Sequence, residues 1–267
     1  MTEQDSHTQF AQETAAVPVI PLADAIHSED RDGLLRAAGD PALTADLALA
    51  LLKRADLPGE VLEQLSKNST ALKLRKVKVA LVCHPHTPRH VSVPLTRQFY
   101  TFDLMKVALS PVVPADVKLS ADEVLIARLK TITLGERLTL ARQASGRIAG
   151  ALLLDPEQRI MRAALENSRL TEALVVQSVL KATASVALVQ AVSRHAKWSY
   201  RRGVQVSLLR TEHLSLARAL AFARPISPPQ LREILQSSRL PAKIKDQILR
   251  ESGFTGSGKS GIRDLTG

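Results

Sequence analysis

The sequence has little cysteine, few aromatic side chains, few glycines and no long apolar run. One cysteine, Cys83, excludes an internal disulfide framework and any metal cluster that several cysteines hold. Aromatic residues make up 3% of the chain and 12 of its 267 residues are glycine, which is unlike a β-sandwich or a β-barrel. No apolar run reaches the roughly 18 residues of a membrane span, and the acidic, polar start is unlike a secretory signal. We therefore expect a cytoplasmic protein with no membrane partner.

What the sequence does contain is small aliphatic residues in short amphipathic stretches. Hydrophobic residues make up 45% of the chain, and most of them are Leu, Ala and Val. Stretches of about 10 to 13 residues alternate with Pro, Gly, Asn or Ser, and none shows sustained period-2 alternation. Thr44 is placed to cap a helix over 45–54, and Pro58 suits the first turn of a helix that ends near Asn68. The pattern predicts an all-α fold.

The chain also resembles itself at an offset of 127 positions. Residues 43–118 align without gaps on residues 170–245, and sixteen of these 76 positions are identical. Unrelated sequences would match at very roughly 7% of positions. Short helices that bury their apolar faces only against neighbours form repeat arrays. The offset therefore predicts a right-handed α-solenoid of stacked short helix pairs with an internal tandem duplication.

Three segments carry a resemblance to the bacterial HEAT-like α-solenoids, including the leucine-rich-repeat variants. They are 79–88, 134–142 and 163–171, which share an aliphatic helix, a polar break, and Thr-Pro or Leu-Thr before the next helix. The resemblance covers roughly residues 30 to 250 and implies a helical-repeat fold. Some leucine-rich-repeat variants hold an iron–sulfur cluster through cysteines, and with Cys83 alone this property is not carried over.

These patterns also give an expected domain organisation. The first 33 residues have seven Asp or Glu against Arg31 alone, a net charge of −6. We expect a disordered acidic arm over 1–28, an α-solenoid over 29–252 and a flexible tail over 253–267. Within the solenoid, copy one covers about 34–128, linking helices cover 129–157, and copy two covers about 161–252.

Two basic windows, 67–106 and 192–218, correspond under the offset and carry net charges of +7 and +5. Leu74, Val77 and Leu81 form an apolar stripe at i, i+3 and i+7, so the basic residues around them are expected to flank the core. The candidate binding residues are Lys73, Arg75, Lys76, Lys78, Arg194, Lys197, Trp198, Arg201 and Arg202. Such residues either follow an anionic partner or form a solvated helix face with extended basic side chains.

Two other patterns suggest chemistry that their context does not favour. Residues 253–260 fit the phosphate-loop pattern G-x-x-x-x-G-K-[ST], but no strand is expected before them and seven residues follow. Cys83, His84, His86 and His90 could suggest zinc, although a helix-to-turn segment would not bring all four side chains together. His86 and His213 occupy equivalent positions, which favours a shared structural role such as bonding free helix-end carbonyls.

The sequence thus favours a non-catalytic scaffold over an enzyme. It shows no metalloprotease, serine-hydrolase or cysteine–histidine pattern with a recognisable context, so we expect no catalytic residue, metal, cofactor or small-molecule ligand. The leading hypothesis is a helical-repeat protein that binds another macromolecule, with a protein as the first candidate. The alternative is nucleic-acid binding through the paired basic windows.

Overall fold

The computed structural model describes residues 21–252 as helices joined by short loops, with no strand among these residues. The all-α prediction is therefore confirmed. The chain divides into two compact units, with the boundary between Val91 and Ser92. Each unit is described by itself, and the boundary does not coincide with that of the predicted copies. No helix in the described part is long and apolar enough to cross a membrane.

The first unit consists of short helices, and its main packing contacts join a helix to the next helix but one. Helix α2 packs on α4 and α3 packs on α5, so the next helix but one is the packing partner along the chain. The elements are α1 (Leu22–Ala25), α2 (Arg31–Gly39), α3 (Ala45–Leu51), α4 (Gly59–Lys67), the 3-10 helix η1 (Ala71–Lys73), α5 (Arg75–Cys83) and α6 (Arg89–Thr96), which crosses the boundary.

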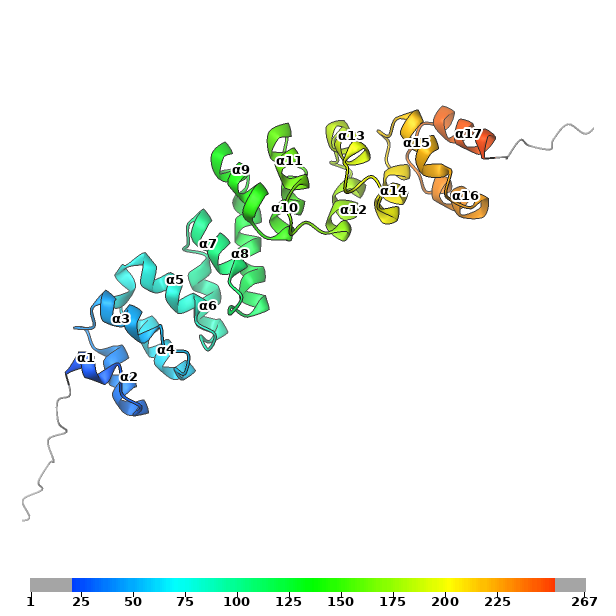
Figure 1. The fold of residues 1–267 in the computed structure, drawn as a ribbon. Coiled ribbons are helices and arrows are strands. Elements are labelled where there is room, and N and C mark those ends of the chain that lie inside the picture. The colour runs from blue at the N-terminus through cyan, green and yellow to red at the C-terminus, as the bar shows by residue number, and fades with distance from the viewer. Residues whose placement is uncertain (1–20, 253–267) are drawn as a thin grey trace, which may run out of the picture. The chain divides into compact units, whose positions relative to one another are not determined.

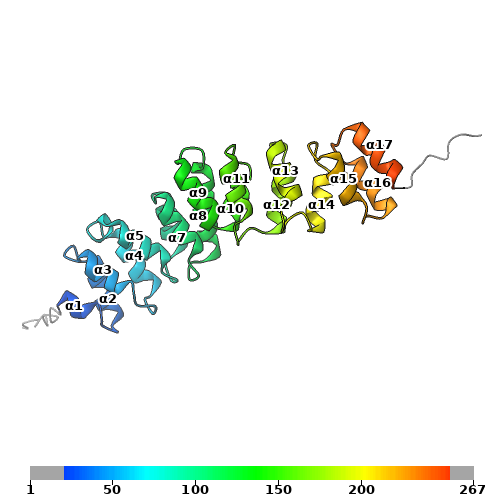
Figure 2. The ribbon, with the colours of Figure 1, turned by 45° about the horizontal axis from the view of Figure 1, so that its top comes forward.

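The second unit continues this rule in two rows (Figures 1 and 2). Helices α8, α10, α12, α14 and α16 pack one on the next in one series, and α9, α11 and α13 in another. The helices are α7 (Thr101–Leu109), α8 (Ala115–Arg128), α9 (Leu134–Gln143), α10 (Gly146–Leu152), α11 (Gln158–Leu165), α12 (Glu172–Leu180), α13 (Val186–Arg194), α14 (Arg202–Leu209), α15 (Leu216–Ala223), α16 (Pro228–Gln236) and α17 (Ala242–Glu251).

Local sequence explains where these helices begin. The hydroxyls of Thr44, Ser145 and Ser185 accept hydrogen bonds from backbone N–H groups in the first turns of α3, α10 and α13. Thr133 and Glu136 form a reciprocal capping box at the start of α9. The expected capping by Thr44 is therefore confirmed.

Side chains in the loops also bond the backbone of helices about 30 residues earlier. Asn68 donates to the carbonyl of Ala38 at 3.1 Å, and its own Oδ1 accepts from the N–H of Thr70. Ser238 donates to the carbonyl of Leu209 at 2.6 Å and accepts from the N–H of Leu240. Each such residue closes its own loop and satisfies a carbonyl of a neighbouring layer of helices, so the layers are joined by polar as well as apolar contacts.

The helix boundaries repeat at the offset found in the sequence. From α2 to α8, each helix has a counterpart, α11 to α17, that begins 127 positions later. The starts pair as Arg31 with Gln158, Ala45 with Glu172, Gly59 with Val186, Arg75 with Arg202, Arg89 with Leu216, Thr101 with Pro228 and Ala115 with Ala242. Packing follows the same correspondence, because α2–α4 matches α11–α13 and α3–α5 matches α12–α14.

Two expectations need correction. Helix α1 lies within the segment assigned to a disordered arm, and Ala25 and Ile26 are buried, so the predicted boundary at residue 28 is too late. Leu74 is 53% exposed, because it precedes α5 in an extended conformation instead of joining Val77 and Leu81 in the core. Residues 1–20 and the phosphate-loop lookalike at 253–260 lie outside the described residues.

Candidate functional site

The basic residues predicted in copy one surround the start of α5. Lys73, Arg75 and Lys76 are exposed, and Lys78 is half-buried. Helix α5 has no acidic residue in its first turn and no side-chain cap, so its basic side chains add to the positive end of the helix dipole. The basic side chains of this region are therefore gathered at the N-terminal end of α5.

The corresponding residues in copy two lie between α13 and α14. Arg194, Lys197, Arg201 and Arg202 are exposed, and Arg202 opens α14 as Arg75 opens α5. Trp198 was predicted to belong to this binding surface, and this prediction is wrong. Its side chain is 2% exposed, because its indole N–H donates to a buried backbone carbonyl beneath it.

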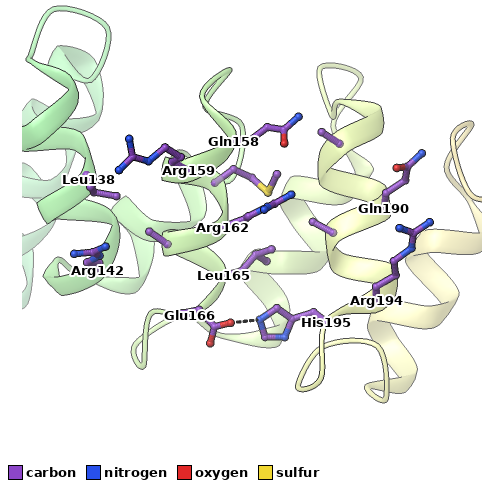
Figure 3. Close-up of a pocket in the computed structure, with 14 residues that line it drawn as sticks. Leu138, Arg142, Gln158, Arg159, Arg162, Leu165, Glu166, Gln190, Arg194 and His195 are labelled. Atoms are coloured by element: carbon purple, nitrogen blue, oxygen red, sulfur yellow. Dashed lines mark hydrogen bonds and ion pairs between the residues drawn. The ribbon is translucent and has the colours of Figure 1, made fainter.

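A hollow in the second unit lies over the row α9, α11 and α13 (Figure 3). It is a groove of about 750 Å³. Its walls carry four arginines, and its floor consists of apolar side chains that include Leu138, Met161 and Leu165. We call this the α9–α11–α13 groove, and the arginines that line it are Arg142, Arg159, Arg162 and Arg194.

These four arginines have no acidic partner among the described residues. Each is exposed, and the described part of the chain provides no ion pair or hydrogen bond to any of their guanidinium groups. Arg159 points from α11 toward α9, and Arg162 points from α11 toward α13 (Figure 3). The guanidinium groups are therefore available to carboxylates or phosphates, which they can bind through two parallel hydrogen bonds.

Glu166 is the one acidic residue that lines the groove, and it is already bonded. Its Oε1 lies 3.1 Å from Nε2 of His195, as the dashed line in Figure 3 marks. The other ring nitrogen of His195, Nδ1, accepts from the N–H of Lys197 at 3.1 Å. Nε2 therefore carries the proton that Glu166 accepts. The side chains that line the groove therefore have a strongly positive net charge.

The groove's chemistry suits some ligands better than others. No Phe, Tyr or Trp side chain lines it, so it lacks the large aromatic platforms on which nucleobases commonly stack. Ala163, Ala187 and Ala191 leave space between the helices for apolar side chains of a ligand. Arginines around an apolar floor fit a protein segment with carboxylates on one side and apolar residues on the other.

Comparisons with known proteins add no assignment. The scan against protein-family models, the search of curated proteins and the search of solved structures each find no match.

The histidines near Cys83 have individual places in the fold. Nε2 of His84 lies 2.7 Å from the carbonyl oxygen of Arg54, and Nδ1 of His86 lies 3.0 Å from that of Leu57. His90 lies 3.5 Å from Glu63 on α4. Among residues 21–252, no group of three His, Cys, Asp or Glu side chains is placed to hold a metal ion.

The shared role expected for His86 and His213, the bonding of free helix-end carbonyls, is found at neither position within the described residues. His86 contacts a carbonyl, but it is the carbonyl before α4 and not one at a helix end. His213 is exposed, and the structure gives no hydrogen bond for it within the described residues. Their identity therefore does not reflect a common contact.

Sequence reasoning named Arg194 but missed the other three arginines of the groove. Arg159 and Arg162 are three positions apart, which places them on neighbouring parts of one helix surface. That spacing was the available signal. Arg142 and Arg194 lie on the same surface as Arg159 and Arg162 because α9, α11 and α13 pack in series. The sequence pattern does not predict this packing.

Proposed function

We propose that this chain is a non-catalytic α-solenoid scaffold, built by tandem duplication, that binds an acidic segment of another protein in the α9–α11–α13 groove. The observation that carries the proposal is the set of four arginines, without acidic partners in the described part of the chain, that surround the apolar floor of a groove of about 750 Å³. Unpaired like charges on one surface disfavour the free protein, and an anionic ligand relieves their repulsion.

The solenoid and the duplication rest on packing and spacing. Packing between next-but-one helices is what stacked helix pairs produce, and it holds for α2–α4, α3–α5 and the two rows of the second unit. Seven consecutive helices have counterparts that start 127 positions later, and this spacing supports descent of the two halves from one ancestral unit.

Nucleic-acid binding is the second candidate, and one observation favours it. Tyr200 is 82% exposed and lies directly before Arg201 and Arg202 at the start of α14. An exposed aromatic ring beside two guanidinium groups can stack on a base while the cations hold the phosphates. This site would lie outside the groove, so the two candidates can be separated by mutation.

The test uses two double charge reversals and two probes. Arg159→Glu/Arg162→Glu changes the groove, and Arg201→Glu/Arg202→Glu changes the start of α14. The probes are a fluorescein-labelled peptide of alternating Glu and Leu and a labelled oligothymidine, followed by anisotropy at several salt concentrations. We expect the peptide to bind the wild type and the Arg201→Glu/Arg202→Glu variant, and to bind the groove variant at least tenfold more weakly.

Two outcomes would contradict the proposal. If the wild type binds the oligothymidine with a steep salt dependence and ignores the peptide, the nucleic-acid alternative replaces it. If both variants bind the peptide as tightly as the wild type does, the groove is not the binding site. Circular dichroism spectra and melting curves of both variants check that the helices are retained.

A further inference from the structure

The α9–α11–α13 groove has a counterpart in the first unit whose charges are already satisfied. Helices α2 and α4 correspond to α11 and α13 at the 127-residue offset, and each pair is in contact. The groove side chains on α11 and α13 therefore have equivalents on the surface of α2 and α4, whereas the positions equivalent to those on α9 lie outside the described residues. The comparison of these two surfaces carries the inference, which rests on the proposed function and its duplication.

The basic side chains on the surface of α2 and α4 form ion pairs with carboxylates of the same surface. Arg31 pairs with Glu60 between the two helices. Lys67 pairs with Glu63 at 3.1 Å within α4, and His90 lies 3.5 Å from the same carboxylate. The Lys67 ammonium, followed by His90, holds the pKa of Glu63 below its usual value, so this carboxylate is charged at neutral pH. Cations here have partners within the protein.

The equivalent positions around the groove have lost those partners. Ala187 stands where copy one has Glu60, and Gln190 stands where it has Glu63. Arg194 stands where copy one has Lys67, so its cation is kept while the carboxylate beside it is gone. Two further cations are present in copy two alone, because Arg159 replaces an aspartate and Arg162 a leucine.

The side chains between the two helices also differ between the copies. Gln64 packs against the C-terminal end of α2, since a Cβ atom added to Gly39 would come within 2.7 Å of its Nε2. The equivalents of Gln64 and Gly39 are Ala191 and Glu166, so copy two has the shorter side chain on α13 and the longer one directly after α11, and both line the groove. The surface of α2 and α4 therefore has its cations paired by its own side chains, whereas the surface of α11 and α13 borders a groove whose arginines have no acidic partner among the described residues.

We propose that the α9–α11–α13 groove is a site for an extended, carboxylate-rich protein segment, and that positions 158, 187 and 190 determine whether such a surface is open or closed. A carboxylate of the partner takes the place that Glu60 or Glu63 occupies in copy one, and pairs with the arginines of copy two. The surface of α2 and α4 is the closed form and does not compete for the ligand.

The geometry sets the size of the segment. Neighbouring helices in a layer are about 8–10 Å apart, so a ligand that crosses all three helices spans roughly 16–20 Å. An extended chain advances about 3.3 Å per residue, which gives a segment of about six residues. Alternate residues of an extended chain face opposite sides, so carboxylates and apolar side chains at alternate positions reach the arginines and the floor respectively.

The test introduces residues of copy one at the equivalent positions of copy two, so that the arginines of the groove gain partners within the protein. The variant Gln158→Arg/Ala187→Glu/Gln190→Glu introduces the equivalents of the Arg31–Glu60 and Lys67–Glu63 pairs and leaves all four arginines in place. Its net charge changes by −1. The matched control is Gln177→Glu, which makes the same net change on an exposed position of α12, outside the groove.

The probe is a labelled six-residue peptide of alternating Glu and Leu, with a Gln-for-Glu peptide as its uncharged counterpart. We expect the wild type and Gln177→Glu to bind the Glu peptide equally, and the triple variant to bind it at least about tenfold more weakly with an unchanged helical spectrum. Equal binding by the triple variant would overturn this inference and leave the proposed function intact. Failure of the wild type to prefer the Glu peptide over the Gln peptide would instead contradict the proposed function.

Discussion

Trp198 donates its indole N–H to the backbone carbonyl oxygen of Leu165 at 3.0 Å. Leu165 is the last residue of α11, where carbonyls have no partner within the helix. At the equivalent place in the first unit, Asn68 donates to the carbonyl of Ala38 at 3.1 Å. The two halves thus satisfy the same backbone group with different side chains, from positions that are not themselves equivalent.

Loss of either donor should destabilise its unit. Trp198→Phe keeps most of the buried ring and removes the N–H, which leaves a carbonyl unsatisfied at a cost of about 1–3 kcal/mol. Urea unfolding followed by circular dichroism measures this, because the variant lacks the single tryptophan that fluorescence would use. Tyr200→Phe is the control, since Tyr200 is 82% exposed and its change should leave the unfolding midpoint where it is. An unchanged midpoint for Trp198→Phe would show that the bond contributes nothing.

His84 makes the stability of the first unit depend on pH. Burial, opposed by the bond to Arg54, lowers the pKa of His84 below its ordinary value of 6.5. As the pH falls below about 6.5, the unfolded chain therefore takes up the proton before the folded chain does. The ionisation of His84 therefore leaves the free energy of unfolding unchanged above pH 6.5. As the pH falls from there toward the folded-state pKa of His84, the free energy of unfolding decreases.

The bonds of His84 explain why the folded state keeps the neutral ring. Nδ1 accepts from the N–H of His86 at 3.3 Å, so Nε2 carries the proton and donates to Arg54. His84→Asn retains a donor and an acceptor without a titrating group. We expect urea midpoints measured from pH 8 to pH 5 to fall more steeply for the wild type than for this variant. Parallel curves would show that His84 does not contribute to the decrease.

Two glycines should respond to alanine in opposite directions. A Cβ atom on Gly146 would lie 2.3 Å from the carbonyl oxygen of Arg169, so Gly146→Ala forces the start of α10 away from the loop before α12. Overpacking of this kind costs about 1–3 kcal/mol. Gly135 has nothing within 4 Å of its added Cβ, and Gly135→Ala should stabilise α9 by roughly 0.5 kcal/mol. Thermal melts of the two variants test the contrast, and a shift in the same direction would contradict it.

The helices are largely predictable from sequence because their signals are local. Caps such as Thr44 and prolines such as Pro58 lie beside the residues they affect, and the amphipathic stretches correspond closely to the helices. The apolar stripe of Leu74, Val77 and Leu81 predicts one helix through all three residues, whereas the structure has η1 and α5 with Leu74 extended between them. Periodicity alone does not reveal such a break, since the apolar spacing continues across it.

The groove is not predictable in the same way. Its arginines come from three helices, and only the packing of α9, α11 and α13 in series brings them onto one surface. The burial of Trp198 likewise depends on a carbonyl 33 positions earlier. The alignment at the 127-residue offset is informative where the two copies differ as well as where they are identical. Differences such as Glu60 against Ala187 mark the groove.

The arginines of the groove should lower the stability of the unliganded protein, although they are needed to bind the acidic segment. Arg159 and Arg162 are three positions apart on α11, and like charges at this spacing disfavour the helix. Arg162→Gln should therefore raise the melting temperature at low salt and weaken binding of the Glu peptide. Added salt screens the repulsion, so the difference in melting temperature should shrink as the salt concentration rises. Melting curves of wild type and variant at 20 mM and 500 mM salt test this. A lower melting temperature for Arg162→Gln at low salt would show that Arg162 stabilises the fold. Repulsion between the arginines of the groove would then not destabilise the unliganded protein.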